Sequence, residues 1–235
     1  MEFVKEQLVI DCNETSPETL NAQIRDAAKR GIKEVVMKNP YARHNLGVGI
    51  TDPIHLIYEG DVGYYAASLC DHISAEVHGN AGWAIGENLM NGEIIVEGNA
   101  ASSTAASMRG GSVVIKGSSG ARTGIGLKGG TLIVGGNVGY MTGFMMQKGR
   151  MIICGNAGKA LGDSMYDGTI YVAGDIAELG NGTKMVDLPK EEYEEIKSLL
   201  ESYGIDAPKA FKKIVCNGML HNFNKKEFGV WKTIL

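Results

Sequence analysis

Short apolar runs recur every 19 residues through the middle of the chain, each after a glycine and one polar residue. They occupy residues 94–96, 113–115, 132–134, 151–153 and 170–172. Residues two apart in a strand face the same side, so the first and last residue of each run should point into one interior. A single run cannot bury such a face alone, whereas stacked runs can. The pattern therefore predicts stacked strands with continuous apolar columns.

Three apolar columns follow from this stacking, two on the strands and one on the opposite arm of each coil. They are Ile94, Val113, Leu132, Met151 and Ile170; Val77, Val96, Ile115, Val134, Ile153 and Val172; and Leu89, Met108, Leu127, Met146 and Met165. Glycines keep the same interval at positions 60, 79, 98, 117, 136, 155 and 174. Nineteen residues are too few for a strand–helix–strand unit but suit one coil with glycine corners. We therefore predict an all-β solenoid, a single-stranded right-handed parallel β-helix of about seven 19-residue coils.

A polar column follows the first corner glycine of the coils. Its members are Asn80, Asn99, Asn137 and Asn156, with Asp61 and Asp175 at the same position. Asparagine tolerates left-handed backbone and can hydrogen-bond along a stack. We expect a structural side-chain ladder here rather than a binding site.

The two ends of the chain differ from the coils and divide it into three predicted regions. Residues 1–50 form a small α/β cap, with strands near 7–10 and 35–37 and a helix that starts after Ser16 and stops at Gly31. Residues 51–180 form the β-helix. Residues 181–235 form an amphipathic helix near 189–203 and a docking tail. Such ends cover the terminal coils, which would otherwise expose unpaired strand edges.

One stretch, Gly124 to Gly129, reads G-x-G-x-x-G, which can indicate dinucleotide binding. That motif must open a helix, whereas here the apolar run 131–134 follows at once. Gly124 also belongs to a 19-residue column with Gly86, Gly143 and Gly162. The repeat therefore explains these glycines.

Composition argues against two classes of function. The net charge of −4 does not suit nucleic-acid binding, and the sequence has no apolar stretch of 18 residues that could span a membrane. We therefore expect a cytoplasmic protein. The four cysteines are widely scattered, which predicts neither a zinc site, an iron–sulfur cluster nor a disulfide framework. The five histidines lie outside any metal-binding spacing, although a metal held between coils would make the chain an independent β-helix enzyme.

One outward strand position is also apolar. Its members Val114, Ile133 and Ile152 alternate with the inward columns, so they should face away from the core. A helix over 189–203 would be about 22 Å long, too short to cover the whole stripe. We therefore predict that these three residues line an interface with a partner or with a second copy of the chain.

Several segments resemble a known family. The repeats "GTLIVGGNVG" and "LGDSMYDG" are similar to the GXGXG β-helix domain at the C-terminus of the glutamate synthase large subunit. The resemblance is greatest to the stand-alone small subunit of archaeal split and N-methylglutamate synthase-type enzymes. Arg43 and His44 before the first coil, and Asn222, Phe223 and Asn224 near the end, belong to that likeness and are further candidate interface residues. One of the subunits of formylmethanofuran dehydrogenase contains the same domain.

The resemblance implies a non-catalytic scaffold with no catalytic, cofactor-binding or metal-binding residue of its own. Its partners would be a glutamine amidotransferase-like subunit and a glutamate synthase-like subunit that carries FMN and an iron–sulfur cluster. The sequence does not decide whether the amine used by such a complex is ammonia or methylamine. The alternative is the β-helix component of a formylmethanofuran dehydrogenase-type complex, and the independent metalloenzyme is the third.

Overall fold

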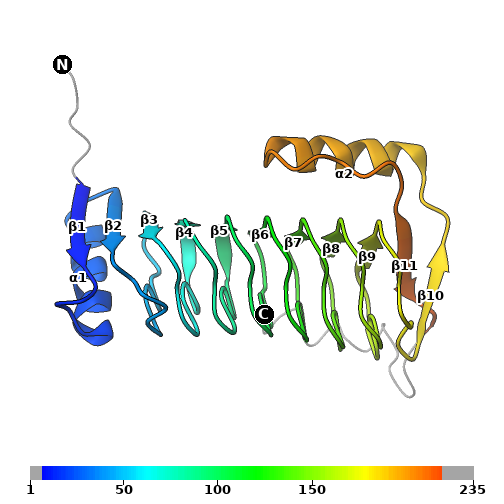
Figure 1. Ribbon diagram of the computed structural model, residues 1–235, viewed down its shortest axis with the longest axis horizontal. Helices are drawn as coiled ribbons and strands as arrows, with labels where there is room; N and C mark the ends of the chain where they lie inside the picture. The colour runs from blue at the N-terminus through cyan, green and yellow to red at the C-terminus, as the bar shows by residue number, and fades with distance from the viewer. Residues whose placement is uncertain (1–6, 219–235) are drawn as a thin grey trace, which may run out of the picture.

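The computed structural model describes residues 7–218, which form one 11-stranded sheet in the order β1-β2-β3-β4-β5-β6-β7-β8-β9-β11-β10 (Figure 1). The strands are β1 (Gln7–Asp11), β2 (Glu34–Lys38), β3 (Ile54–Glu59), β4 (Asp71–Val77), β5 (Asn91–Val96), β6 (Ser112–Ile115), β7 (Thr131–Val134), β8 (Arg150–Ile153), β9 (Thr169–Val172), β10 (Thr183–Val186) and β11 (Lys212–Cys216). Neighbours from β1 to β9 pair in parallel. The predicted β-solenoid of about seven coils is confirmed.

The strand register follows the 19-residue interval. Val113 pairs with Ile94 on one side and with Leu132 on the other, and the same offset continues through β9. All three predicted columns are buried and belong to a single apolar core that runs the length of the stack. The inward assignment of the columns is therefore confirmed.

Each coil turns its corner through alternate residues in left-handed conformation. In one coil these are Ser103, Ala105 and Ser107, with φ of 61°, 54° and 55°. The N–H groups of the first and third donate to the next coil, at Ala121 and Ile125, whereas that of Ala105 donates back to the previous coil. Gly124 and Gly126 hold the second and third places of such a trio in the following coil. Glycine favours this conformation, so the G-x-G spacing is a consequence of the corner.

The first corner glycines have a different requirement. A Cβ on Gly136 would overlap the Ser118 side chain of the coil before it, and the backbone φ there is not left-handed. Close approach of coils, rather than special φ, therefore excludes a side chain at this position.

The polar ladder is confirmed. The N–H of Asn99 donates to Asn80 Oδ1 at 2.9 Å, and the N–H of Ser118 donates to Asn99 Oδ1 at 2.8 Å. Asn137 N–H donates to Ser118 Oγ at 3.0 Å. Ser118 therefore fills the position that the asparagine pattern left open, since its hydroxyl accepts the same bond.

The N-terminal end of the stack is covered by helix α1 (Pro17–Lys29). Ser16 is its N-cap and accepts a hydrogen bond from Thr19 N–H at 3.2 Å. Leu20, Ile24 and Ala27 are fully buried against the core. The predicted strand, helix and strand of this end are confirmed, and both strands join the main sheet.

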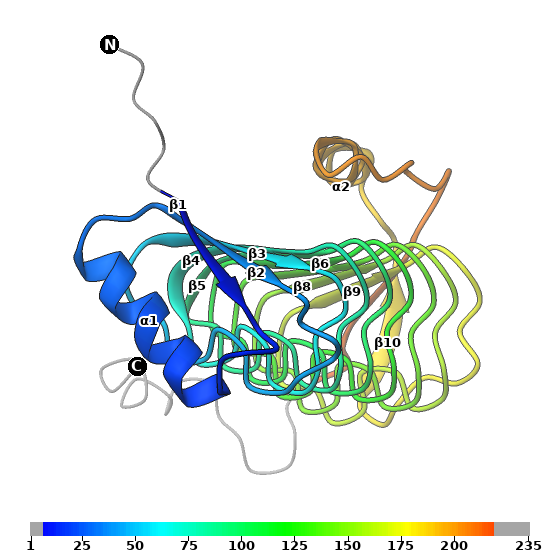
Figure 2. The ribbon, with the colours of Figure 1, turned by 60° about the vertical axis from the view of Figure 1, so that its left-hand side comes forward.

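The C-terminal end reverses strand direction. β11 lies antiparallel between β9 and β10, and its Ile214 enters the core. Between β10 and β11 the chain forms helix α2 (Lys190–Ser202), which lies over the outer face of the sheet (Figures 1 and 2). The helix confirms the prediction, whereas β10 and β11 were not predicted from the sequence. Neither described helix is long and apolar enough to cross a membrane.

Candidate interaction surfaces

The outward apolar stripe is covered by the chain itself. Val114, Ile133 and Ile152 are fully buried, in a second cluster that is separate from the main core. Ile196 and Leu200 of α2 complete this cluster. The outward facing was predicted correctly, but the expectation that these three residues line an interface with a partner or a second copy is wrong, because a helix of the same chain packs on them. The stripe is most apolar over β6–β9. The helix α2 lies over these strands and buries its own apolar residues against them.

Polar contacts fix α2 at both of its ends. Near its start, Glu192 accepts hydrogen bonds from the Tyr171 hydroxyl and from Lys213 Nζ, the latter at 2.7 Å. Burial alone would raise the pKa of Glu192, but these bonds and the Lys213 charge lower it overall. Just beyond its end, the Tyr203 hydroxyl donates to Glu93 Oε1 at 2.7 Å. The helix is therefore an integral part of the fold.

Arg43 and His44 lie at the start of the stack and take part in different contacts. Arg43 Nη1 donates to the Thr15 carbonyl at 3.0 Å, which ties the first corner to the cap. His44 Nδ1 accepts from Tyr64 N–H at 2.9 Å, and the two rings stack at 4.3 Å. Tyr64 stacks in turn on Trp83, with ring centroids 5.4 Å apart. His44 thus begins an exposed aromatic row. Asn222, Phe223 and Asn224 lie outside the described residues.

A groove runs across the left-handed corner segments of several coils, of which residues 103–107 are one, and has a volume of about 450 Å³. Tyr65 and Trp83, 47% and 54% exposed, lie toward one end, and Phe144 and Met145 lie toward the other. The remaining lining residues are Ala84, Glu87, Ser103, Ala106, Ser107, Ile125, Gly126, Lys128 and Gln147.

Small residues in one coil create the groove. Ala106 is one coil after Glu87 and two before Phe144, and Ser107 is two coils before Met145. The sequence did not predict this surface, because the groove depends on how one coil differs from the others and not on what the coils share. The signal was the small side chains of Ala106 and Ser107 at positions where other coils have larger ones.

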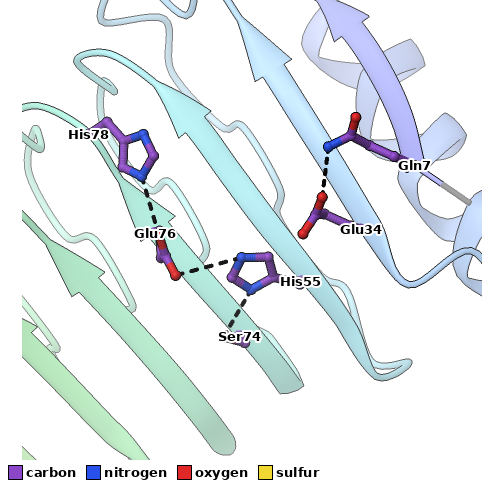
Figure 3. Close-up of polar contacts among 6 residues, drawn as sticks. All are labelled: Gln7, Glu34, His55, Ser74, Glu76 and His78. Carbon is purple, nitrogen blue, oxygen red and sulfur yellow. Dashed lines mark hydrogen bonds and ion pairs between the residues drawn. The ribbon is translucent and has the colours of Figure 1, made fainter. Parts of the chain in front are cut away.

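A cluster of polar side chains lies on the outer face of β3 and β4 (Figure 3), a part of the sheet that α2 does not cover (Figure 1). Glu76 lies between two histidines: its Oε2 is 3.2 Å from His78 Nε2, and its Oε1 is 3.7 Å from His55 Nε2. His55 Nδ1 is 3.1 Å from Ser74 Oγ. Within residues 7–218, no group of three or more His, Cys, Asp or Glu side chains is arranged to hold a metal ion.

The cysteines are not arranged for chemistry in the described part of the chain. Burial raises the pKa of Cys12, Cys70 and Cys154 to about 11, so these thiols stay protonated at neutral pH. Cys70 Sγ donates to the Gly47 carbonyl at 3.1 Å. Cys12 and Cys70 belong to the interior core, whereas Cys154 is partly buried against the second cluster under α2.

A solenoid of glycine-cornered coils with a short cap at each end defines the class of this protein. The chain matches the family described as "GXGXG motif" over residues 7–234, and it belongs to this family. Protein GlxC of Rhizobium meliloti (strain 1021) is 40% identical over 58 residues. That match spans 25% of this chain and 25% of GlxC.

Proposed function

We propose that this chain is a non-catalytic scaffold subunit of a split glutamate synthase-type or N-methylglutamate synthase-type oxidoreductase in the cytoplasm. Membership of the GXGXG family supports a glutamate synthase-related role. The observation that carries the scaffold role is the contrast between its interior and its surface. The interior is filled by apolar columns, whereas one corner displays exposed aromatic and methionine side chains in a groove. Such residues are enriched at protein interfaces.

In the proposed complex, one partner is a glutamine amidotransferase that releases ammonia, and the other is a synthase subunit that holds FMN and an iron–sulfur cluster. This chain holds the two in a fixed relation and contributes no reacting group.

Reconstitution tests this proposal. The purified chain alone should form no glutamate from glutamine and 2-oxoglutarate and should retain no flavin. Mixed with a candidate amidotransferase subunit and a candidate FMN subunit from the same organism, the chain should restore glutamine-dependent glutamate formation, which the two partners without it should lack. Equal activity with and without the chain would refute the scaffold role. If the chain is instead pulled down from native extract together with a molybdenum or tungsten protein, the formylmethanofuran dehydrogenase-type alternative is favoured.

A further inference from the structure

The charge of the chain is distributed unevenly along the stack. Residues 98–162 contain no Asp or Glu, although the whole chain has a net charge of −4. The same segment contains seven basic residues: Arg109, Lys116, Arg122, Lys128, Lys148, Arg150 and Lys159. The middle coils therefore form a basic band within an acidic protein.

Two of these cations are neutralised on the strand side. Lys116 Nζ is 2.9 Å from Glu97, and Arg150 Nη1 is 2.6 Å from Glu195 of α2. The other five, Arg109, Arg122, Lys128, Lys148 and Lys159, lie in the left-handed corner segments or within a few residues of them. None of the five has a carboxylate within ion-pair distance among residues 7–218. The unpaired positive charge is therefore concentrated on the side of the coils that carries the groove.

The repeat places this charge next to the groove. Lys128 lines it, and Arg109 occupies the equivalent position one coil earlier. Arg122 follows one coil after Ser103, which also lines the groove, and Lys148 adjoins a further lining residue. Glu87 is the one carboxylate among the described residues of the lining. The groove thus combines an apolar floor with a basic rim.

We propose that this corner groove docks an amphipathic segment of a partner subunit whose apolar face is flanked by Asp and Glu side chains. The identity of the partner rests on the proposed function, but the chemistry of the segment rests on the groove. Apolar side chains would fill the space over Ala106 and Ser107 between Trp83 and Phe144. Carboxylates would pair with Arg109, Arg122 and Lys128, where complementary charge gives orientation and speeds association.

Other occupants fit the charge less well. The chain's own residues 219–235 contain Lys225, Lys226 and Lys232 but only one acidic residue, Glu227, so their charge does not complement the rim. Aromatic rings beside cations also suit single-stranded nucleic acid. However, the aromatic row from His44 to Trp83 precedes the basic band, and the rings of that row stack on one another.

Point variants in the assembled complex test the proposal. Trp83→Ala removes an exposed ring without opening the core, and Lys128→Glu reverses one rim charge. Lys116→Glu is the matched control, because it reverses a charge of the same basic band on the strand side. Titration of each variant into the partner subunits should show at least about ten-fold weaker binding of one partner for the first two, and unchanged binding for the control. Equal binding by all variants would overturn the groove proposal and leave the scaffold role standing.

A direct probe separates failure of the groove from failure of the proposed function. A synthetic amphipathic helix of Leu and Glu should shift the fluorescence of Trp83 in a Trp231→Phe background, and Lys128→Glu should weaken this binding. A Leu and Lys helix should not bind. If wild-type chain recovers no partner but binds the acidic helix, the docking surface stands and the glutamate synthase assignment fails. Absence of binding to the acidic helix in that case, or binding of oligo(dT) in its place, would overturn the proposal.

Discussion

At the scale of single residues, glycine serves two separate purposes in each coil. Gly136 lies where the neighbouring coil comes too close for any side chain, and Gly126 lies where φ is +61° but the nearest obstacle to a Cβ is Ser107 Oγ at 3.4 Å. The first position excludes side chains by overlap, and the second only penalises them by backbone strain. Substitutions at the two should therefore differ in size.

Gly136→Val should lower the free energy of unfolding by about 3 kcal/mol, because the side chain would push two coils apart. Gly126→Ala should cost only about 1–2 kcal/mol, the strain of a left-handed alanine. Urea titrations of both variants give the comparison. Equal stabilities of Gly136→Val and wild type would show that the coils do not stack as described.

The polar ladder gives a second prediction. Asn99→Ala leaves the Ser118 N–H without its acceptor and should cost about 1 kcal/mol. Asn99→Asp should retain most of that stability, because a carboxylate accepts the same bond, as Asp61 does from Asn80 N–H. Thermal melts of the pair test whether the Oδ1 acceptor, rather than the bulk of the side chain, matters here. If both variants lose the same stability, the ladder is not what stabilises the corner.

At the scale of elements, the coils followed directly from the sequence and the ends did so only in part. The 19-residue interval determines register, because one column of residues serves every coil. β10 and β11 repeat nothing, and β11 pairs antiparallel after α2, so periodicity could not predict them. The apolar stripe that includes Ile133 was correctly predicted to face outward. It was expected to pack on a partner or a second copy of the chain, whereas it packs on α2. Helix length alone does not reveal that Ile196 and Leu200 lie over its most apolar part.

Ile133→Lys should release α2, because it places an ammonium group under the helix. Limited proteolysis should then cut within residues 190–202 while the coils stay resistant. Val9→Lys is the control, because Val9 occupies the same outward column on β1 and is 50% exposed. Continued protection of α2 in Ile133→Lys would mean that the helix is attached by other contacts.

The start of α2 should respond to pH. The pKa of Glu192 is below its ordinary 4.5 in the folded chain, so its ionised form stabilises folding above about pH 4.5 and this contribution is lost as pH falls through the lower folded value. Glu192→Gln should therefore melt at a lower temperature than wild type at pH 7, and the two melting temperatures should converge toward pH 3. A difference that does not change with pH would exclude the carboxylate as its source.

At the scale of the whole molecule, the fold is a rod whose interior is filled by apolar side chains that stabilise it. Apolar columns fill the core, α2 covers the outer stripe over β6–β9, and α1 and β10–β11 occupy its two ends. Within residues 7–218, neither α1 nor α2 covers the corner groove or the outer face of β1–β4, so these are the candidate surfaces for the proposed partners. This distribution is what a scaffold requires and is the basis of the proposed role.

Native mass spectrometry of the affinity-purified chain, isolated from the cells that naturally express it, is the decisive test of that role. We expect an assembly of defined mass that contains this chain, a glutamine amidotransferase subunit and a subunit that carries FMN. Trp83→Ala should deplete one of these partners, while Lys116→Glu should retain both. A chain recovered alone, or with partners of neither kind, would contradict the scaffold role.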